Sequence, residues 1–137
     1  TLVASGLRPD AIVTDLDGEV EHQVKANSMG SLVFIHGHGD NIDAVRAFVP
    51  RFGGRVVGTC QGAPSGDLFN MGGFTDGDRA ACIFSHLGAR RITLVGFDFE
   101  RPSPKTCRAS DVKLRKLAWA KRILESLVEQ GVRIDGL

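Results

Sequence analysis

The sequence predicts an α/β protein built on an open parallel β-sheet with helices on both faces. Short apolar runs alternate along the chain with amphipathic stretches. The runs are apolar on both faces, as in buried parallel strands. Strands that alternate with helices form βαβ units. Polar residues and glycines follow the apolar runs directly. Together these observations predict a three-layer Rossmann-like architecture.

Five apolar runs are the expected strands, and they cover residues 11–14, 32–35, 56–58, 92–96 and 132–134. Four stretches between and after them are the expected helices, over residues 19–30, 40–50, 75–88 and 110–131. Asp40 and Thr75 are the expected N-caps of two of these helices and Ser110 opens the longest, while Pro50 and Gly131 mark ends. The expected inward-facing residues are Ile42, Val45 and Val49 on the first of the three, Ala80, Ile83, Phe84 and Leu87 on the next, and Leu114, Leu117, Leu124, Leu127 and Val128 on the longest.

Composition describes one ordinary globular domain over residues 1–137. Hydrophobic residues make up 42% and charged residues 24%, which excludes disorder. Lys and Arg number 17 against 16 Asp and Glu, a formal net charge of +1, so we expect no nucleic-acid partner and no membrane surface. The chain starts at Thr1 in what reads as the end of a helix, so we expect an N-terminal segment of the parent protein before it.

Three cysteines, at positions 60, 82 and 107, are widely spaced and form no CxxC pair. An odd and scattered set argues against a disulfide framework and against a zinc knuckle. We therefore expect a reducing, cytoplasmic location.

Acidic and polar residues gather where the expected strands end. Because ligands bind at the carboxyl ends of parallel strands, this edge is the expected ligand site. The candidates are Asp15, Asp17, His36, His38, Asp40, Asn41, Gln61, Asn70, Thr75, Asp76, Asp78 and Asp98.

Six aspartates at one edge would repel each other unless a cation or hydrogen bonds offset their charge. Carboxylate oxygens suit Mg²⁺, which proteins hold through one or two carboxylates together with substrate phosphates. The expected ligands are Asp15 and Asp17, with Asp76 or Asp78 completing the shell. No GxxxxGK[ST] segment is present, so the predicted Mg-nucleotide site is not a P-loop.

Simpler interpretations stay open for each residue. Asp15 and Asp17 alternate faces if their strand continues, and both reach one metal only if it bends at Gly18. Asp76 and Asp78 suit the first turn of a helix, and Thr75 with Asp78 resembles a capping box. His36 and His38 could instead be metal ligands, and Asp40 could serve only as a helix cap. Four other residues could serve only in packing: Cys82, His86, Phe97 and Phe99.

The segment 101–110 contains two prolines and three basic residues and no acid. It follows the expected strand that ends at Asp98 and feeds a helix N-terminus, which favours anions. We expect it to close over phosphates, with Lys105, Arg108 and Lys113 as nearby cations.

Six motifs occur in order along nearly the whole chain: P-D-x-I-V-T-D-L-D-G from Pro9, H-G-H-G-D-N from His36, G-T-C-Q from Gly58, N-M-G-G-F-T-D-G-D-R-A from Asn70, L-G-A-R-R-I-T-L-V-G-F-D-F from Leu87 and K-L-R-K-L from Lys113. Together they resemble the archaeal-type 6-hydroxymethyl-7,8-dihydropterin diphosphokinase family. That family is distantly similar to thiamine diphosphokinases, whose acidic segments parallel residues 15–17 and 72–78. The same module also resembles a domain of flagellin-modification proteins.

The resemblance implies a Mg²⁺-dependent transferase of pterin (folate-type) biosynthesis that moves diphosphate from ATP to the hydroxymethyl group of the pterin and releases AMP. Asp98 or His38 would then be the base, and Asn41, Gln61 and Asn70 would bind the pterin edge. The nucleotide would involve His36, Asp40, Thr75, Lys105 and Lys113. The non-enzymatic alternative is a nucleotide- or sugar-nucleotide-binding module of a glycan-modification protein. Small molecules are the expected partners, and a homodimer is left open.

Overall fold

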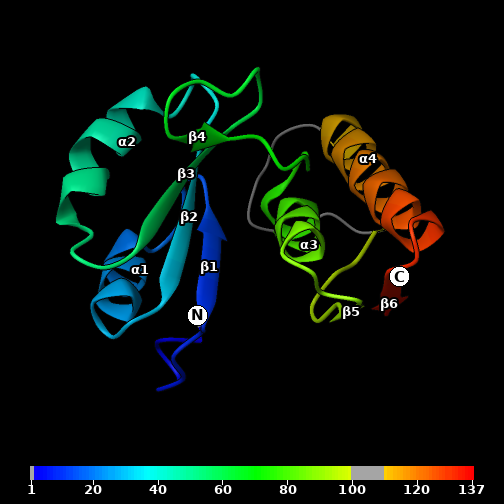
Figure 1. Cartoon of the computed structure of the whole chain (residues 1–137), viewed down its shortest axis with the longest axis horizontal. Coiled ribbons are helices and arrows are strands. Elements are labelled where there is room, and N and C mark those ends of the chain that lie inside the picture. The colour runs from blue at the N-terminus through cyan, green and yellow to red at the C-terminus, as the bar shows by residue number, and fades with distance from the viewer. Residues whose placement is uncertain (1, 100–109) are drawn as a thin grey trace. The chain divides into compact units, whose positions relative to one another are not determined.

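A computed structural model describes residues 2–99 and 110–137. The chain forms two compact units, Thr1–Asn70 and Met71–Leu137. Both consist of parallel strands and helices (Figure 1). The predicted α/β class is therefore confirmed, with the strands distributed over two sheets.

The first unit contains a four-stranded parallel sheet in the order β1-β2-β3-β4. The strands are β1 (Ala11–Thr14), β2 (Leu32–Gly37), β3 (Val56–Cys60) and β4 (Leu68–Phe69). The first three lie where the sequence predicts them, and β4 is an addition of two residues at the edge. Since Thr14 pairs with Ile35, and Gly37 pairs with Cys60, the carboxyl ends of β1, β2 and β3 meet at one edge.

Two helices, α1 (Val20–Ser28) and α2 (Ile42–Phe48), pack on one face of this sheet. Alternation along β2 directs Val33 and Ile35 toward the helices and Phe34 and His36 toward the opposite face. The core cluster consists of Leu16, Val20, Val33, Ile35 and Phe52. A 3₁₀ turn, η1 (Val49–Arg51), extends α2 through Pro50.

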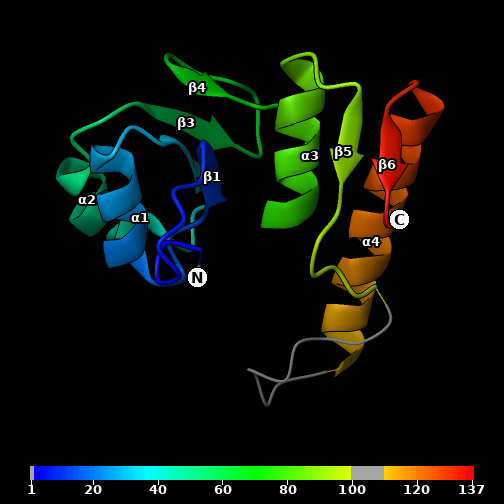
Figure 2. The same cartoon turned by 90° about the horizontal axis from the view of Figure 1, so that it is seen from below.

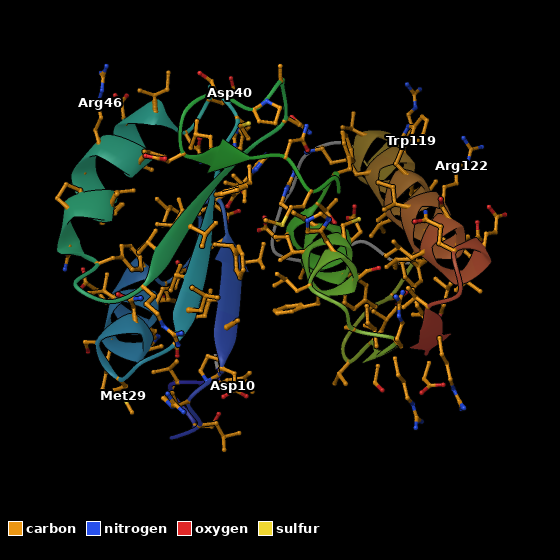
Figure 3. The ribbon with its side chains drawn as sticks, in the orientation of Figure 1. Asp10, Met29, Asp40, Arg46, Trp119 and Arg122 are labelled. Carbon is orange, nitrogen blue, oxygen red and sulfur yellow. The ribbon has the colours of Figure 1, made fainter. Side chains whose placement is uncertain are left out.

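The N-cap residue of α2 is Asn41, not Asp40 as the sequence predicts. Asn41 does not cap the helix with its side chain, because its amide bonds to neighbouring strand ends instead. Asp40 is exposed in the loop between β2 and α2, and Figure 3 shows it at the opposite end of the sheet from Asp10.

The second unit pairs β5 (Arg91–Thr93) in parallel with β6 (Arg133–Asp135). Helices α3 (Asp76–His86) and α4 (Ser110–Glu129) pack with these strands (Figure 2). The core cluster consists of Ala81, Cys82, Leu124, Leu127 and Val132. Asp135 joins the two strands through its carboxylate, which accepts hydrogen bonds from Arg91 at 2.7 Å and Arg133 at 2.9 Å.

The apolar stripes of α3 and α4 differ in part from the prediction. Leu124 and Leu127 of α4 are buried as expected, but Leu114 and Val128 are exposed. The buried stripe of α4 passes through Ala120, Leu124 and Leu127, so those two exposed residues fall to one side of it. On α3, Ile83 is buried as predicted and Leu87 is exposed.

Trp119 and Arg122 lie on an exposed side of α4 (Figure 3). The guanidinium carbon of Arg122 lies 5.3 Å from the centre of the Trp119 ring, a cation–π distance. In the part of the chain that the structure describes, no helix combines the length and the apolarity needed to cross a bilayer.

Asn27, buried near the end of α1, connects three segments at the amino-terminal edge of the first sheet. Its Nδ2 donates hydrogen bonds to the carbonyls of Ser31 and Arg55, both at 3.0 Å. Its Oδ1 accepts a hydrogen bond from the Gly54 N–H at 2.7 Å. A Cβ at position 54 would lie 2.6 Å from the Asn27 carbonyl oxygen, so this approach requires glycine.

We expect Asn27→Ala to lower the free energy of unfolding by about 3 kcal/mol, because it leaves buried backbone groups without partners. Asn27→Asp should cost at least as much, since a carboxylate cannot donate to the two carbonyls. Chemical denaturation checks both variants, with the exposed Ser28→Ala as control. Wild-type stability in Asn27→Ala would contradict the connecting role.

Candidate functional site

The turn that follows β1 determines where the two aspartates of the first unit lie. The Leu16 N–H donates to Thr14 Oγ1 at 3.0 Å, and the Asp17 N–H donates to Asp15 Oδ1 at 3.2 Å. Leu16 has a left-handed backbone with φ of 69°. The strand therefore ends at Thr14, and the chain bends at Leu16 as well as at Gly18, where the sequence predicts a bend.

This bend brings Asp15 and Asp17 together. Each offers a carboxylate oxygen within 4.8 Å of a carboxylate oxygen of the other, so both side chains can reach one metal ion. Burial, followed by the charge of Asp15, raises the pKa of Asp17 above its usual value of 3.8. The imidazole of His38 acts in the opposite direction and lies with Nε2 3.6 Å from Asp15 Oδ2.

Asn41 holds the ends of β1 and β2 at fixed positions. Its Nδ2 donates to the carbonyls of Asp15 at 2.8 Å and His36 at 2.7 Å. Its Oδ1 accepts from the His38 N–H at 3.1 Å. Because both amide hydrogens bond to the protein's own backbone, the predicted contact with a pterin edge could use only Oδ1, which has a second lone pair to accept a hydrogen bond.

His36 is buried in the sheet, in contrast to the exposed His38. Its Nδ1 lies 3.1 Å from Thr59 Oγ1, which itself donates to the Ile35 carbonyl at 3.3 Å. A hydroxyl that has already donated its proton can only accept, so the His36 proton is assigned to Nδ1. The direct contact of His36 with a nucleotide stays a prediction.

Gln61 follows β3 and begins the loop that leads to β4, and Asn70 follows β4. Asn70 Nδ2 donates to the carbonyls of Gln61 at 3.0 Å and Gly62 at 2.9 Å. The amide of Asn70 thus closes the loop. Their predicted contact with substrate stays untested.

In the second unit, Thr75 and Asp78 form the predicted capping box at the start of α3. Asp78 is fully buried, and its carboxylate accepts from the N–H groups of Phe74 at 2.6 Å and Thr75 at 2.8 Å. The Thr75 hydroxyl also bonds to Asp78. Asp76 instead is partly exposed and lies 3.8 Å from a guanidinium nitrogen of Arg79. Between the two predicted metal ligands on α3, Asp76 is the one with an accessible carboxylate.

Asp98 is exposed after β5, and the rings of the residues before and after it, Phe97 and Phe99, lie 5.7 Å apart between their centres. Phe97 also approaches the first turn of α3, where a Cβ at Gly77 would lie 2.4 Å from the ring. Lys105, Arg108 and the predicted closing segment 101–109 lie outside the described residues, as does the side chain of Lys113.

Cys60 and Cys82 carry free thiols. Burial and the neighbouring Asp78 raise the pKa of Cys82 to about 11. This thiol therefore stays protonated at neutral pH and acts as an apolar core residue, as the sequence predicts.

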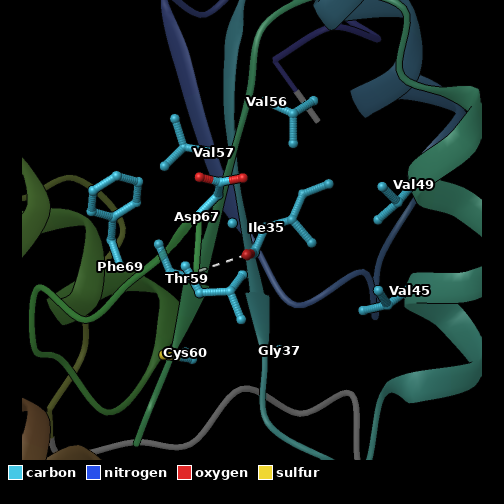
Figure 4. A pocket seen from close by; sticks show the side chains of 12 residues that line it. Ile35, Gly37, Val45, Val49, Val56, Val57, Thr59, Cys60, Asp67 and Phe69 are labelled. Carbon is cyan, nitrogen blue, oxygen red and sulfur yellow. Dashed lines mark hydrogen bonds between the residues drawn. The ribbon is translucent and has the colours of Figure 1, made fainter. Parts of the chain in front are cut away.

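Sequence reasoning did not single out Asp67, which borders a cavity in the first unit. The cavity is lined mostly by valine, isoleucine and other apolar side chains of α2, β2, β3 and β4 (Figure 4). An isolated aspartate in a glycine-rich loop carries no motif. Only the position of Asp67 directly before the edge strand β4 could have identified it, and the sequence does not reveal that strand.

Parallel strands connected through helices make the chain an α/β protein, a class in which ligands bind at the carboxyl ends of the strands. The chain belongs to the 6-hydroxymethylpterin diphosphokinase MptE-like family, whose family model matches residues 1–103. The family resemblance seen in the six sequence motifs is thereby confirmed.

Three relatives carry the name 6-hydroxymethyl-7,8-dihydropterin pyrophosphokinase. The protein from Methanothermobacter thermautotrophicus is 42% identical over 98% of this chain and 62% of its own length. The relative from Pyrococcus furiosus is 41% identical over 95% of this chain and 58% of its own length. The relative from Methanocaldococcus jannaschii is 38% identical over 89% of this chain and 56% of its own length. The chain thus spans less than two thirds of each relative.

We expect Asp17→Asn to raise the melting temperature at pH 7 in the absence of divalent cations. A raised folded-state pKa means that the folded state holds this proton more tightly than the unfolded state. Ionisation of Asp17 therefore costs stability above the raised pKa and costs nothing below the unfolded value of 3.8. The gain should shrink as the pH falls toward 3.8 and below.

Differential scanning fluorimetry across pH measures this effect. Asp10→Asn is the matched control, because Asp10 is fully exposed at the other end of β1. Mg²⁺ should raise the melting temperature of the wild type and shift Asp17→Asn less. Equal Mg²⁺ shifts in both proteins would show that Asp17 is not a ligand.

We expect Asp78→Ala to lower the free energy of unfolding by about 2 kcal/mol, through loss of the capping box. Asp78→Asn should cost less, since an amide oxygen can still accept one backbone hydrogen bond. Urea denaturation, compared with Asp76→Ala, checks the ranking. A larger loss in Asp76→Ala than in Asp78→Ala would reverse the two assigned roles.

Proposed function

We propose that the parent protein transfers diphosphate from ATP to the hydroxymethyl group of 6-hydroxymethyl-7,8-dihydropterin and releases AMP. The observation that carries the proposal is the pair Asp15–Asp17, held by a bent turn at the carboxyl edge of a parallel sheet. The printed names of three relatives at 38–42% identity support the choice of substrate.

The pair fits a Mg²⁺ ion by its chemistry. Both groups are hard oxygen ligands, and the raised pKa of Asp17 reflects burial and the repulsion that a cation would relieve. Mg²⁺ held there would neutralise phosphate charge and so favour attack on the nucleotide. The completion of this set by Asp76 is part of the proposal.

In the proposed reaction the hydroxymethyl oxygen forms a bond to the β-phosphorus, and the bond from that phosphorus to the α–β bridging oxygen breaks. AMP leaves with that oxygen, and the hydroxyl proton passes to a base. His38 and Asp98 are the two candidate bases. Asp15 would hold the His38 imidazole by the contact at 3.6 Å.

Other assignments belong to the same proposal. His36, Asp40, Thr75, Lys105 and Lys113 are proposed for the nucleotide, and Gln61 for the pterin. The cytoplasmic location rests on the pattern of scattered cysteines. A homodimer stays a prediction without a structural argument.

The test incubates the full-length protein with ATP, MgCl₂ and 6-hydroxymethyl-7,8-dihydropterin and measures AMP by chromatography. We expect AMP to appear only when the pterin is present, to stop with EDTA and to return with excess Mg²⁺. Asp17→Asn should lose on the order of 100-fold in kcat, and Asp10→Asn should keep the wild-type rate. Undiminished AMP release in EDTA, or none from the wild type with Mg²⁺, would refute the proposal.

A further inference from the structure

An apolar cavity of about 530 Å³ lies in the first unit between α2 and the strands β2, β3 and β4. Figure 4 shows Val45 and Val49 on its helix side and Val56 and Val57 on its strand side. Its volume falls within the range of about 300–1,000 Å³ that is typical of small-molecule sites. Several apolar residues of this region, such as Leu68 and Phe69 of β4, are exposed, so the chain alone leaves the cavity open.

Gly58 belongs to the sheet side of the cavity. This residue pairs with Ile35 of β2 and with Leu68 of β4, so it lies at the centre of the three strands. A Cβ at position 58 would lie 2.6 Å from Leu68 Cδ2, which leaves little room for a side chain. Glycine at this position leaves room for the Leu68 side chain to lie over β3, so Leu68 forms part of the apolar wall of the cavity.

The cavity also reaches the carboxyl edge of the sheet. Gly37 and Cys60, the last residues of β2 and β3, belong to its lining. Since Thr14 pairs with Ile35, Asp15 follows β1 at nearly the same level as Gly37. A ring in the cavity would therefore lie beside the edge that carries Asp15 and Asp17.

Asp67 is the single charged residue among those that line the cavity. A turn fixes its backbone: the Leu68 N–H donates to the Ser65 carbonyl at 3.2 Å, and Gly66 has φ of 60°. Asn70 closes the same loop through its two bonds to the carbonyls of Gln61 and Gly62. Hydrogen bonds within the loop thus hold the backbone that carries the Asp67 carboxylate.

We propose that this cavity is the pterin-binding site and that the Asp67 carboxylate accepts hydrogen bonds from N3–H and the 2-amino group of the ring. The inference rests on the proposed function. These two donors lie side by side, and their spacing matches the two oxygens of one carboxylate. Adenine presents one donor beside one acceptor at its pairing edge, so the same carboxylate disfavours adenine.

The test compares two probes in the full-length protein by isothermal titration calorimetry. One is 6-hydroxymethylpterin, and the other is 6-hydroxymethyllumazine, which has an oxygen in place of the 2-amino group. We expect the wild type to bind the pterin roughly 10-fold or more tightly than the lumazine. Asp67→Asn should abolish or reverse this preference, because its amide can donate to the lumazine oxygen.

Matched variants separate the cavity from general effects on the fold. Asp10→Asn, the same chemical change at an exposed site, should keep the wild-type preference. Val45→Phe places a larger side chain in the cavity from α2 and should weaken pterin binding without weakening ATP binding. Far-UV circular dichroism monitors folding, and Val45→Phe decides the question if Asp67→Asn does not fold.

The outcomes distinguish this inference from the proposed function. A wild-type pterin preference in Asp67→Asn, or unchanged pterin affinity in Val45→Phe, overturns the assignment of the cavity even if AMP is released. Loss of ATP affinity instead of pterin affinity in Asp67→Asn also overturns it, because the cavity would then hold adenine. The wild type could also bind pterin in a way that depends on Asp67 and yet release no AMP. That result would support the assignment of the cavity and refute the proposed reaction.

Discussion

Leu16 adopts a left-handed backbone because its side chain is buried in the core of the first unit, at 4% exposure. A left-handed conformation costs a residue other than glycine about 1–2 kcal/mol. Burial of a leucine side chain contributes about 1.5–3 kcal/mol, so burial exceeds the cost by a small margin. The carboxylates on either side of Leu16 owe their closeness to this balance. The candidate metal site thus depends on the packing of an apolar side chain in the core.

Asparagine amides complete the framework around that turn. Asn27 lies at the amino-terminal edge of the sheet, Asn41 at the carboxyl edge, and Asn70 beside β4. Each donates its amide hydrogens to two backbone carbonyls. Uncharged amides therefore hold these three loop ends, while Asp15 accepts the Asp17 N–H within the turn after β1. In the second unit the division differs, since Asp78 caps α3 itself.

The sequence was sufficient to predict the elements with strong local signals. β2 is a continuous apolar run, and Thr75 with Asp78 makes a local capping pattern, so both were predicted correctly. Signals that depend on tertiary contacts were missed. β4 has two residues and no periodicity, and it exists because it pairs with β3. Asp40 resembled a cap by residue type, but the N-cap position of α2 is Asn41, whose amide bonds to two strand-end carbonyls instead of to the helix.

The same distinction applies to the candidate site. The pair Asp15–Asp17 was recognised from its position after a strand, but whether the two carboxylates meet depended on the φ of Leu16, which sequence does not specify. Asn41 and Asn70 were expected to face a substrate, since amides suit ring edges. Their bonds to nearby backbone carbonyls became visible only in three dimensions. The position of Asp67 beside a cavity depends on β4 and was hidden for the same reason.

The short edge strand β4 has a consequence for motion. It pairs with β3 through Leu68 and Phe69 alone, and a strand of two residues at a sheet edge opens more readily than the strands inside. Leu68 and Phe69 of β4 form part of the apolar wall of the cavity, and Asp67, which carries the carboxylate, directly precedes β4. Occupancy of the cavity would therefore be coupled to closure of the edge, and slower hydrogen exchange at the amides of β4 would report a bound ring before any reaction occurs.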